Sequence, residues 1–249
     1  MAAYRKTGYT CPATSSLLGK TSQAPSSLAA LLYETPKKRR AFFSFHFDDI
    51  MRVNVVRNAW RFAHPDDPSF TDSSLWESRK LEGKDALKEL IRGGVSNTSA
   101  VCVLIGSETW HRPWVRYEIA RSVIDERGLL AVHINSIRHH QTKVSEALGY
   151  NPLDWLGVGK VFIPSILAKS EYYLFEKHAL HDGFGRIRWE WRRYPEYTRP
   201  VKLPPWLGDP DPGYLMPLSA QAPVYDFAAD DGHRNLGIWI DAAAQRAGR

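Results

Sequence analysis

Hydrophobic positions along this chain follow two patterns that alternate from residue 40 onward. Short continuous apolar runs are typical of buried strands, and apolar residues repeating every three or four positions are typical of helices that bury one face. The runs predict strands over 41–46, 100–105 and 129–134, with a further short strand at 73–77. The repeats predict a helix with Ile50, Val53, Val56 and Trp60 on one face, and helices over about 84–92 and 113–126. Such alternation predicts a mostly parallel sheet flanked by helices.

Capping and breaking residues set the expected ends of these helices. Asp48 or Asp49 is a candidate N-cap for the first helix, and Pro113 suits the first position of the third, where its missing N–H costs nothing. We expect the pair Gly93-Gly94 to stop the second helix, because glycine commonly follows a helix C-terminus. The prolines at 65 and 68 predict a loop.

The last third of the chain has a different pattern. Two strand-like runs, 171–180 and 186–194, flank His181-Asp-Gly-Phe-Gly185, which predicts a β-hairpin, and a helix is expected over about 231–246. The fold class predicted is α/β: a flavodoxin-like core at about 40–160, with an appended hairpin and C-terminal helix over 161–249 packed on the same domain. Residues 1–39, rich in Ser, Ala, Thr and Pro, are expected to be a disordered extension.

Charge and apolar run length restrict the class of partner. The formal net charge is +6, but residues 1–40 hold seven basic residues against Glu34 alone, which leaves 26 basic and 26 acidic residues in 41–249. The basic patch of a nucleic-acid-binding domain is therefore not expected. Apolar runs stop at about six residues, far short of the roughly 20 that span a bilayer. Two cysteines in 249 residues favour a reducing, cytoplasmic location without a membrane anchor.

Glu118 is the carboxylate best placed for chemistry. The strand 100–105 ends in Gly106-Ser107, and in an open α/β sheet ligands bind where the strands end. The following helix carries Trp114 and Glu118 one turn apart. A glutamate beside an aromatic ring there can serve a reaction that builds up positive charge, such as cleavage of a glycosidic bond. The alternative is a surface glutamate paired with Arg112 or Arg121, because the pattern is short and has many chance matches.

Other candidates have structural alternatives of the same kind. Asp48 and Asp49 follow the first strand and can bind a ribose hydroxyl or cap a helix, and Trp76 can stack on a planar ring or pack under a loop. His46 ends the first strand at the ligand edge, where an ordinary loop histidine is the alternative. No histidine has partners at metal spacing, so no metal site is expected. The chain lacks phosphate-binding glycine loops and the nucleophile elbow, which argues against ATPase, dehydrogenase and α/β-hydrolase chemistry.

Several of these segments, taken in order, resemble one family. They are the first-strand segment 41–49 with Arg52-Val-Asn-Val-Val-Arg-Asn58, then Ser74-Leu-Trp-Glu77, Asn97-Thr-Ser99, residues 101–107, Arg112-Pro-Trp-Val-Arg-Tyr-Glu-Ile119 and Val224-Tyr-Asp-Phe-Ala-Ala-Asp-Asp-Gly232. Together they resemble the TIR-like domains once called MTH538-type, and among these the TIR subunit of the bacterial Thoeris anti-phage system. The resemblance covers nearly all of 40–245. Pro113 departs from it, since a basic or polar residue is expected there.

The resemblance implies an enzyme that consumes NAD+ as its substrate, releases nicotinamide, needs no separate cofactor, and makes an ADP-ribose-derived, cyclic messenger. Glu118 takes the position of the catalytic glutamate. Phe45, His46 and Asp49 would border the nicotinamide and ribose, with Ser107 and Trp114 on the opposite wall and Trp76 as a further substrate-binding candidate.

The resemblance also implies partners: a phage-derived trigger, a separate effector protein that the diffusible messenger activates, and a possible homo-oligomer. Two other functions stay open. One is a TIR module that recruits partners without catalysis, and the other is a nucleoside base-transfer enzyme.

Overall fold

The structure is a computed structural model that describes residues 39–63, 83–139, 141–164, 169–181, 183 and 186–249. The expectations for the extension before residue 39, for the loop at 65–68 and for the strand at 73–77 with Trp76 lie outside these ranges. The first sheet holds four parallel strands, in the order β1-β2-β3-β8. These strands are β1 (Ala41–Ser44), β2 (Ala100–Ile105), β3 (Gly128–His133) and β8 (Val224–Asp226). The expected parallel α/β sheet is confirmed.

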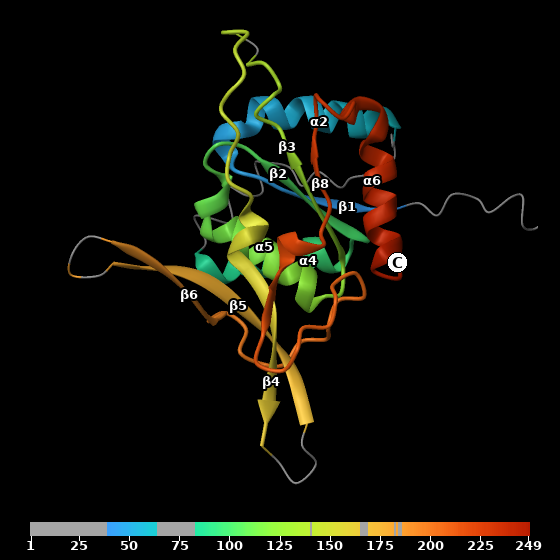
Figure 1. Ribbon diagram of the computed structural model, residues 1–249. Coiled ribbons are helices and arrows are strands. Elements are labelled where there is room, and N and C mark those ends of the chain that lie inside the picture. The colour runs from blue at the N-terminus through green and yellow to red at the C-terminus, as the bar shows by residue number, and fades with distance from the viewer. Residues whose placement is uncertain (1–38, 64–82, 140, 165–168, 182, 184–185) are drawn as a thin grey trace, which may run out of the picture. The chain divides into compact units, whose positions relative to one another are not determined.

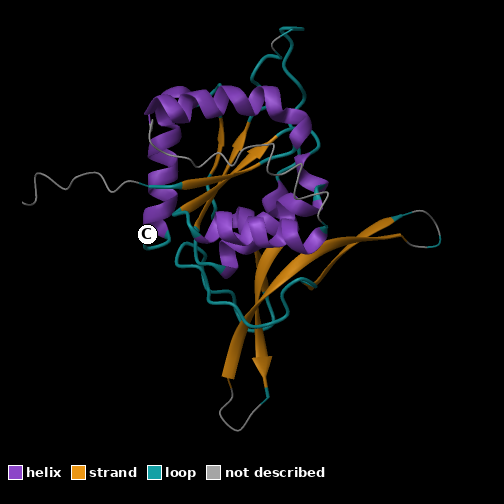
Figure 2. Ribbon diagram, turned by 180° about the vertical axis from the view of Figure 1, so that it is seen from behind, coloured by secondary structure: helices purple, strands orange, loops and turns teal. Residues whose placement is uncertain are grey.

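Helices cover both faces of this sheet (Figures 1 and 2). Helices α4 (Lys84–Ser96) and α5 (Pro113–Ile124) share one buried cluster with Phe42, Val101 and Val103. Helices α2 (Ile50–Ala63) and α6 (Gly232–Arg246) share the other with Phe43 and Cys102. Because successive strand residues point to opposite faces, one apolar run supplies both clusters. The expected inward face of α2 is confirmed, since Val53, Val56 and Trp60 are buried.

Helix α4 does not stop at its glycine pair, as we expected it to. It continues to Ser96, and Val95 in the added turn is buried. A Cβ at Gly94 would lie 2.8 Å from the Phe42 ring, so glycine there lets the helix pack closely against β1. A Cβ at Gly93 would meet nothing within 4 Å. Gly94 therefore serves a helix–strand contact, and neither glycine ends the helix.

The C-terminal third forms a second sheet and also completes the first. Strands β4 (Leu156–Ile163), β5 (Lys169–His181), β6 (Ile187–Arg193) and β7 (Leu215–Pro217) make an antiparallel sheet in the order β6-β5-β4-β7. The expected hairpin is confirmed as β5 and β6, but it belongs to this larger sheet. Strand β8 pairs with β3, and α6 buries Leu236 and Ile240 against the same parallel sheet. The last residues are thus part of the α/β layers and are not appended to them.

Short 3-10 helices connect several of these elements: η1 (Phe47–Asp49), η2 (Thr109–His111), η3 (Pro152–Trp155) and η4 (Leu218–Ala220). Two of them, η1 and η2, directly follow the carboxyl ends of β1 and β2. Among the described helices, none combines the length and apolar character needed to cross a bilayer.

We predict that alanine at the two adjacent glycines of α4 has opposite effects on stability. Gly94→Ala forces a methyl group against the buried Phe42 ring, whereas Gly93→Ala places it in open space and gains helix propensity. We expect the free energy of unfolding to differ between the two variants by about 1–3 kcal/mol, with Gly94→Ala the less stable. Urea denaturation measures this difference. Equal stability would show that Phe42 moves aside without cost.

Candidate functional site

Glu118 is a buried carboxylate on the inner side of helix α5. Pro113 is at the first helical position, as expected, and Val115, Ile119 and Val123 form the buried apolar stripe. Glu118 lies beside this stripe and is 1% exposed. The sequence left a surface position open as the alternative, and the structure places the side chain inside the protein.

Ser44 is the polar partner of this carboxylate. Its hydroxyl donates a hydrogen bond of 2.5 Å to Oε2 of Glu118, and both side chains are buried. Ser44 is the last residue of β1 and shares the strand face of Phe42, which packs toward α4 and α5. Glu118 is therefore anchored at the carboxyl end of β1, an outer strand of the parallel sheet as described, and α/β sheets bind ligands at the carboxyl ends of their strands. Sequence analysis missed Ser44. Its position two residues after Phe42 on the same strand could have indicated that both side chains point to the same face of the sheet.

The interpretation of Glu118 as a surface glutamate paired with an arginine is wrong. Arg121 pairs instead with Asp125, one turn further along α5. Arg112 lies close enough to His46 to lower the pKa of that imidazole. Among the described residues, Ser44 is the hydrogen-bond partner recorded for Glu118.

Burial gives Glu118 an unusual proton affinity. Desolvation raises its pKa to about 8, and the hydrogen bond from Ser44 opposes part of that rise. The side chain is therefore mostly protonated at neutral pH in this structure. A positive charge bound beside it would favour the carboxylate form, because opposite charges lower the pKa of an acid. The site is thus suited to a ligand that carries or develops positive charge.

Asp49 is a second buried carboxylate near the ends of β1 and β2. Burial and the nearby Glu146 carboxylate raise its pKa to about 6, while Arg52 and the Thr109 hydroxyl oppose the rise. Its Oδ1 lies 3.7 Å from Nη1 of Arg52, and the Thr109 hydroxyl approaches Oδ2 at 3.5 Å. A Cβ at Gly106 would lie 1.9 Å from Oδ2, so only glycine allows this carboxylate to lie over the end of β2. Asp49 is the buried last residue of the short helix η1 and directly precedes the first residue of α2.

The segment 141–151 is tied to this carboxylate through Arg52. Nη2 of Arg52 lies 2.8 Å from Oε1 of Glu146, and its Nε donates to the Ile137 carbonyl at 3.0 Å. The Ser107 hydroxyl donates to Oε2 of Glu146 at 3.3 Å. One arginine thus joins α2, the end of β2 and the segment after β3. Sequence analysis placed Ser107 and Asp49 at the site but missed Arg52 and Glu146, which connect them.

Phe45 and His46 lie between β1 and η1, as expected from the sequence. Phe45 is half-buried against the cluster under α2. Nε2 of His46 lies 3.0 Å from Oδ2 of Asp48. Burial and the Arg112 guanidinium lower the pKa of His46, although Asp48 opposes this effect. His46 is therefore neutral at pH 7, and one ring nitrogen can donate a hydrogen bond while the other accepts one.

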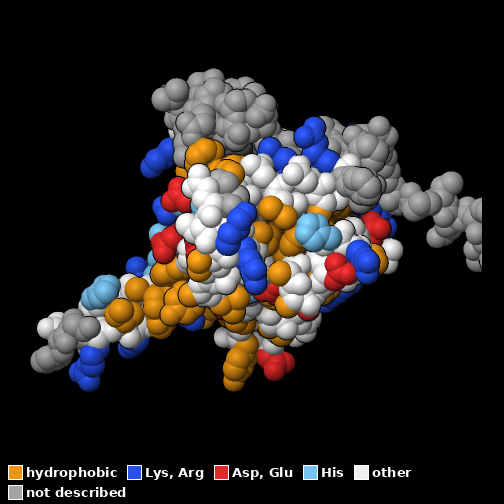
Figure 3. Space-filling view, turned by 90° about the horizontal axis from the view of Figure 1, so that it is seen from above, with side chains coloured by type: hydrophobic (Ala, Val, Ile, Leu, Met, Phe, Trp, Pro, Cys, Tyr) orange, Lys and Arg blue, Asp and Glu red, His pale blue; other side chains and the backbone are white. Residues whose placement is uncertain are grey.

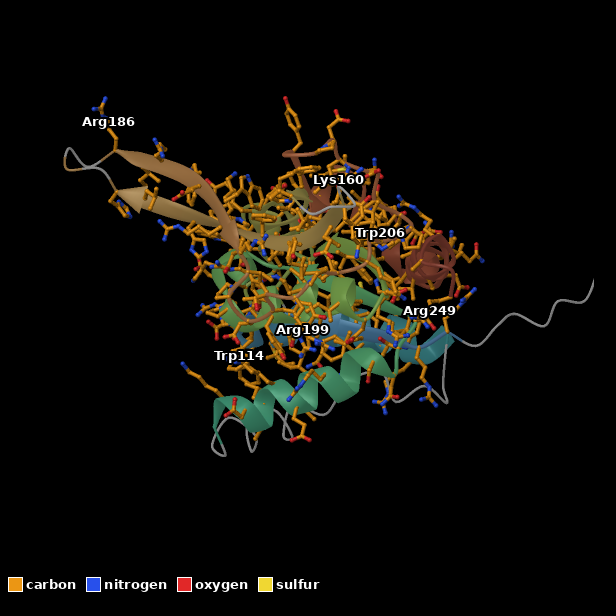
Figure 4. All side chains as sticks on the ribbon, turned by 90° about the horizontal axis from the view of Figure 1, so that it is seen from below. Trp114, Lys160, Arg186, Arg199, Trp206 and Arg249 are labelled. Atoms are coloured by element: carbon orange, nitrogen blue, oxygen red, sulfur yellow. The ribbon has the colours of Figure 1, made fainter. Side chains whose placement is uncertain are left out.

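Trp114 is not brought to the Glu118 carboxylate. Its ring meets Tyr117 edge-on, with centroids 6.2 Å apart, and lies beside α4 (Figure 4). There it lines a cavity of about 350 Å³ together with Lys88, Tyr117 and Glu176, and Glu118 is not among the lining residues. Trp76, the other aromatic candidate, lies outside the described residues. The part of the chain that the structure describes contains no cluster of three or more potential metal ligands.

Two comparisons with known proteins agree on the relationship of this chain. Residues 42–139 match the family model described as Thoeris protein ThsB, TIR-like domain. A protein of Bacillus cereus (strain MSX-D12), named "Putative cyclic ADP-D-ribose synthase ThsB1", is 35% identical over 208 residues. The alignment covers 82% of this chain and 99% of that relative. The matched family segment includes both Ser44 and Glu118.

We predict that Glu118 makes stability fall as pH rises. Its folded pKa of about 8 exceeds the ordinary value of 4.5, so the native state holds a proton that the unfolded chain releases. The resulting stabilisation is fully present below pH 4.5 and is lost as pH rises through 8. Relative to Glu118→Gln, the free energy of unfolding of the natural chain should drop by about 2–4 kcal/mol between pH 5 and 8. Urea denaturation across this pH range tests it, and a constant difference would contradict the assignment.

We also predict that Arg52 holds the segment 141–151 in place. Arg52→Met removes the cation from two carboxylates, of which Asp49 is buried. We expect a loss of about 2–4 kcal/mol in stability and faster amide hydrogen exchange in 141–151. Arg61→Met, at an exposed position of the same helix, is the matched control and should change stability by less than about 0.5 kcal/mol. Unchanged exchange in the Arg52 variant would show that the segment is held by other contacts.

Proposed function

The chain belongs to the Thoeris ThsB TIR-like family, and we propose that it is an enzyme that cleaves the nicotinamide–ribose bond of NAD+ and makes a cyclic ADP-ribose-type product. The observation that carries the proposal is the buried Glu118 carboxyl group, held by Ser44 at the carboxyl end of the central sheet. The name of the Bacillus cereus relative, a cyclic ADP-D-ribose synthase, supports the same reaction.

The chemistry fits the environment of Glu118. When the C–N bond breaks, its electron pair leaves with nicotinamide, and the ribose becomes an oxocarbenium-like cation. The positively charged nicotinamide ring of NAD+ favours ionisation of Glu118 on binding, and the carboxylate then stabilises the ribose cation that replaces that charge. A carboxylate in a site of low polarity stabilises a cation more strongly than one in water.

The outcome of the reaction depends on which nucleophile reaches the cation. If water is excluded, a hydroxyl elsewhere in the same ADP-ribose forms the new bond, releases its proton, and closes a ring. If water reaches the cation, free ADP-ribose results. The burial of Glu118 and Ser44 supports the first course. In this scheme Glu118 is the catalytic residue and Ser44 is a positioning residue.

Substrate binding is assigned to the groups around the strand ends. Asp49 is the candidate partner for ribose hydroxyls, and Phe45 with the neutral His46 borders the nicotinamide. Ser107 lies on the side formed by the end of β2. Trp114 and Trp76 complete the set proposed from the family resemblance, with Trp114 acting through the packing of α5 because its ring lines another cavity.

The proposed setting is cytoplasmic immunity against phage. NAD+ is the substrate, a phage-derived trigger starts the reaction, and the product diffuses to a separate effector protein. Neither a nucleic acid nor a membrane is needed for this scheme, and no cofactor beyond the substrate is invoked. A TIR module without catalysis and a base-transfer enzyme are the alternatives, and the products distinguish all three.

We predict that Glu118→Gln lowers nicotinamide release from NAD+ by at least about 100-fold, because the amide cannot balance the developing charge. The measurement uses lysates of phage-infected cells expressing the chain, with nicotinamide and ADP-ribose products quantified by mass spectrometry. Glu108→Gln, an exposed glutamate before the same helix, is the matched control and should retain full turnover.

Three results would argue against the proposal. Retained turnover in folded Glu118→Gln would remove Glu118 as the catalytic residue. Exchange of the base without a cyclised product would favour the base-transfer enzyme. Phage defence by the natural chain with no NAD+ consumption would favour the interaction module.

A further inference from the structure

Strand β6 forms an open edge of the antiparallel sheet. The order β6-β5-β4-β7 places it outermost, and no described strand pairs with its outer side. Half of its backbone N–H and C=O groups therefore point away from β5. Such an edge can accept a further strand, and proteins usually protect it with charges or cover it.

Beyond residue 176, no described strand pairs with the hairpin of β5 and β6. The pairing of β4 with β5 ends at Leu156 and Glu176, whereas β5 and β6 remain paired as far as His181 and Ile187. This two-stranded part, residues 177–181 and 187–191, is named the hairpin arm here. It extends away from the parallel sheet, with Arg186 at its far end (Figures 1 and 4). A two-stranded ribbon is marginally stable in water without further packing.

The hairpin arm nevertheless exposes large apolar side chains. Ile187 is 55% exposed and Trp189 is 45% exposed. Trp155 meets Trp189 edge-on at a centroid distance of 4.7 Å, and the Lys177 ammonium lies 5.7 Å from the Trp189 ring. Hydrophobic side chains gather along the arm in the space-filling view (Figure 3). An apolar surface on an otherwise unsupported ribbon indicates that another chain packs there.

Charges on β6 alternate in sign along one face. Arg188, Glu190 and Arg192 share that face, because successive residues of a strand point to opposite sides. Trp189, Trp191 and Arg193 share the other. Within the chain, Arg192 donates two hydrogen bonds to Oε2 of Glu190, at 3.1 and 3.2 Å. Both side chains are about half exposed, so the pair can exchange partners with a neighbouring strand.

The charges on β6 complement the same sequence run antiparallel, and the registers differ in whether they also oppose like charges. Pairing about a twofold axis at Trp191 puts Glu190 opposite Arg192 of the partner subunit, and Trp189 opposite Arg193 of the partner subunit. A twofold axis at Glu190 instead puts Arg188 opposite Arg192 of the partner subunit. An axis at Trp189 puts Arg188 opposite Glu190 of the partner subunit, but it also puts Arg192 opposite Arg186 of the partner subunit. Like charges directly opposite are destabilising, so the register about Trp191 is favoured.

We propose that two copies of this chain associate through antiparallel pairing of their β6 strands about Trp191. The two four-stranded sheets then join into one continuous sheet across a twofold axis. Each hairpin arm gains a third strand, and the Trp189 rings of both copies lie on the same face of the joined sheet. The proposed partner is a second copy, and not an unrelated strand, because the alternating charges of β6 pair with opposite charges when the same strand lies antiparallel to it.

Sedimentation equilibrium of the full chain over about 1–100 µM tests the proposal. The natural chain should self-associate. Glu190→Arg and Arg192→Glu each place like charges at both symmetric pairs, and each should weaken self-association by about tenfold or more. Mixing these two variants restores both pairs in a heterodimer, so the mixture should associate about as tightly as the natural chain. The double variant Glu190→Arg/Arg192→Glu should also recover self-association.

Arg188→Glu is the matched control for the register. Arg188 faces Tyr194 of the partner subunit in the proposed pairing, so this variant should keep self-association within about twofold. Circular dichroism of every variant excludes loss of folding. A natural chain that stays monomeric at all concentrations would overturn the proposal. It would also be overturned by single variants that associate like the natural chain, by a mixture that does not, or by Arg188→Glu as the disruptive change. None of these outcomes bears on NAD+ turnover, so the two proposals fail separately.

Discussion

The hydrogen bond between the Ser44 hydroxyl and the Glu118 carboxyl group is the contact on which the proposed site depends. Removing a carboxylate from water is costly unless a partner compensates or a proton neutralises it. Here both occur, since Ser44 donates one hydrogen bond and burial raises the pKa to about 8. The resting group is therefore close to the balance between its two protonation states. A cationic substrate can shift that balance at neutral pH. A solvent-exposed glutamate with an ordinary pKa is already ionised there, so the substrate would not change its protonation state.

The surrounding structure keeps that group in place from two directions. The close approach of α4 to β1, which Gly94 permits, supports the strand that ends in Ser44. On the side of β2, Arg52 connects Asp49 with Glu146 and so ties the segment 141–151 to the strand ends. Glycine at position 106 leaves room for the Asp49 carboxylate. Two buried carboxylates with raised pKa values thus lie near the carboxyl ends of β1 and β2, each with its own polar partners.

The sequence predicted a strand correctly where every residue of the strand is buried. The run Ala100–Ile105 is a strand at those limits, and α5 starts at the proline expected to start it. The sequence pattern gave a wrong helix end where a glycine has a packing role. Gly93-Gly94 predicted the end of the helix, but α4 continues to Ser96, and Gly94 leaves room for the Phe42 ring. The sequence pattern also missed the eight-residue strand β4 and the three-residue strands β7 and β8. A strand as short as β7 or β8 is specified by its neighbours and hardly by its own pattern. Trp114 was placed near Glu118 by helical spacing, yet its ring contacts Tyr117.

The sequence by itself determined the alternating strands and helices, the position of Glu118 one helix after a central strand, and the family to which the chain belongs. These features depend on local periodicity and on motifs of consecutive residues, which are visible without coordinates. Only the tertiary structure decided that Glu118 is buried and not paired with Arg121, that Ser44 is its partner from 74 positions earlier, and that Arg52 connects Asp49 to Glu146. Contacts between residues so distant along the chain depend on how the layers pack. Packing also sets how far a carboxylate is buried, and burial shifts its pKa.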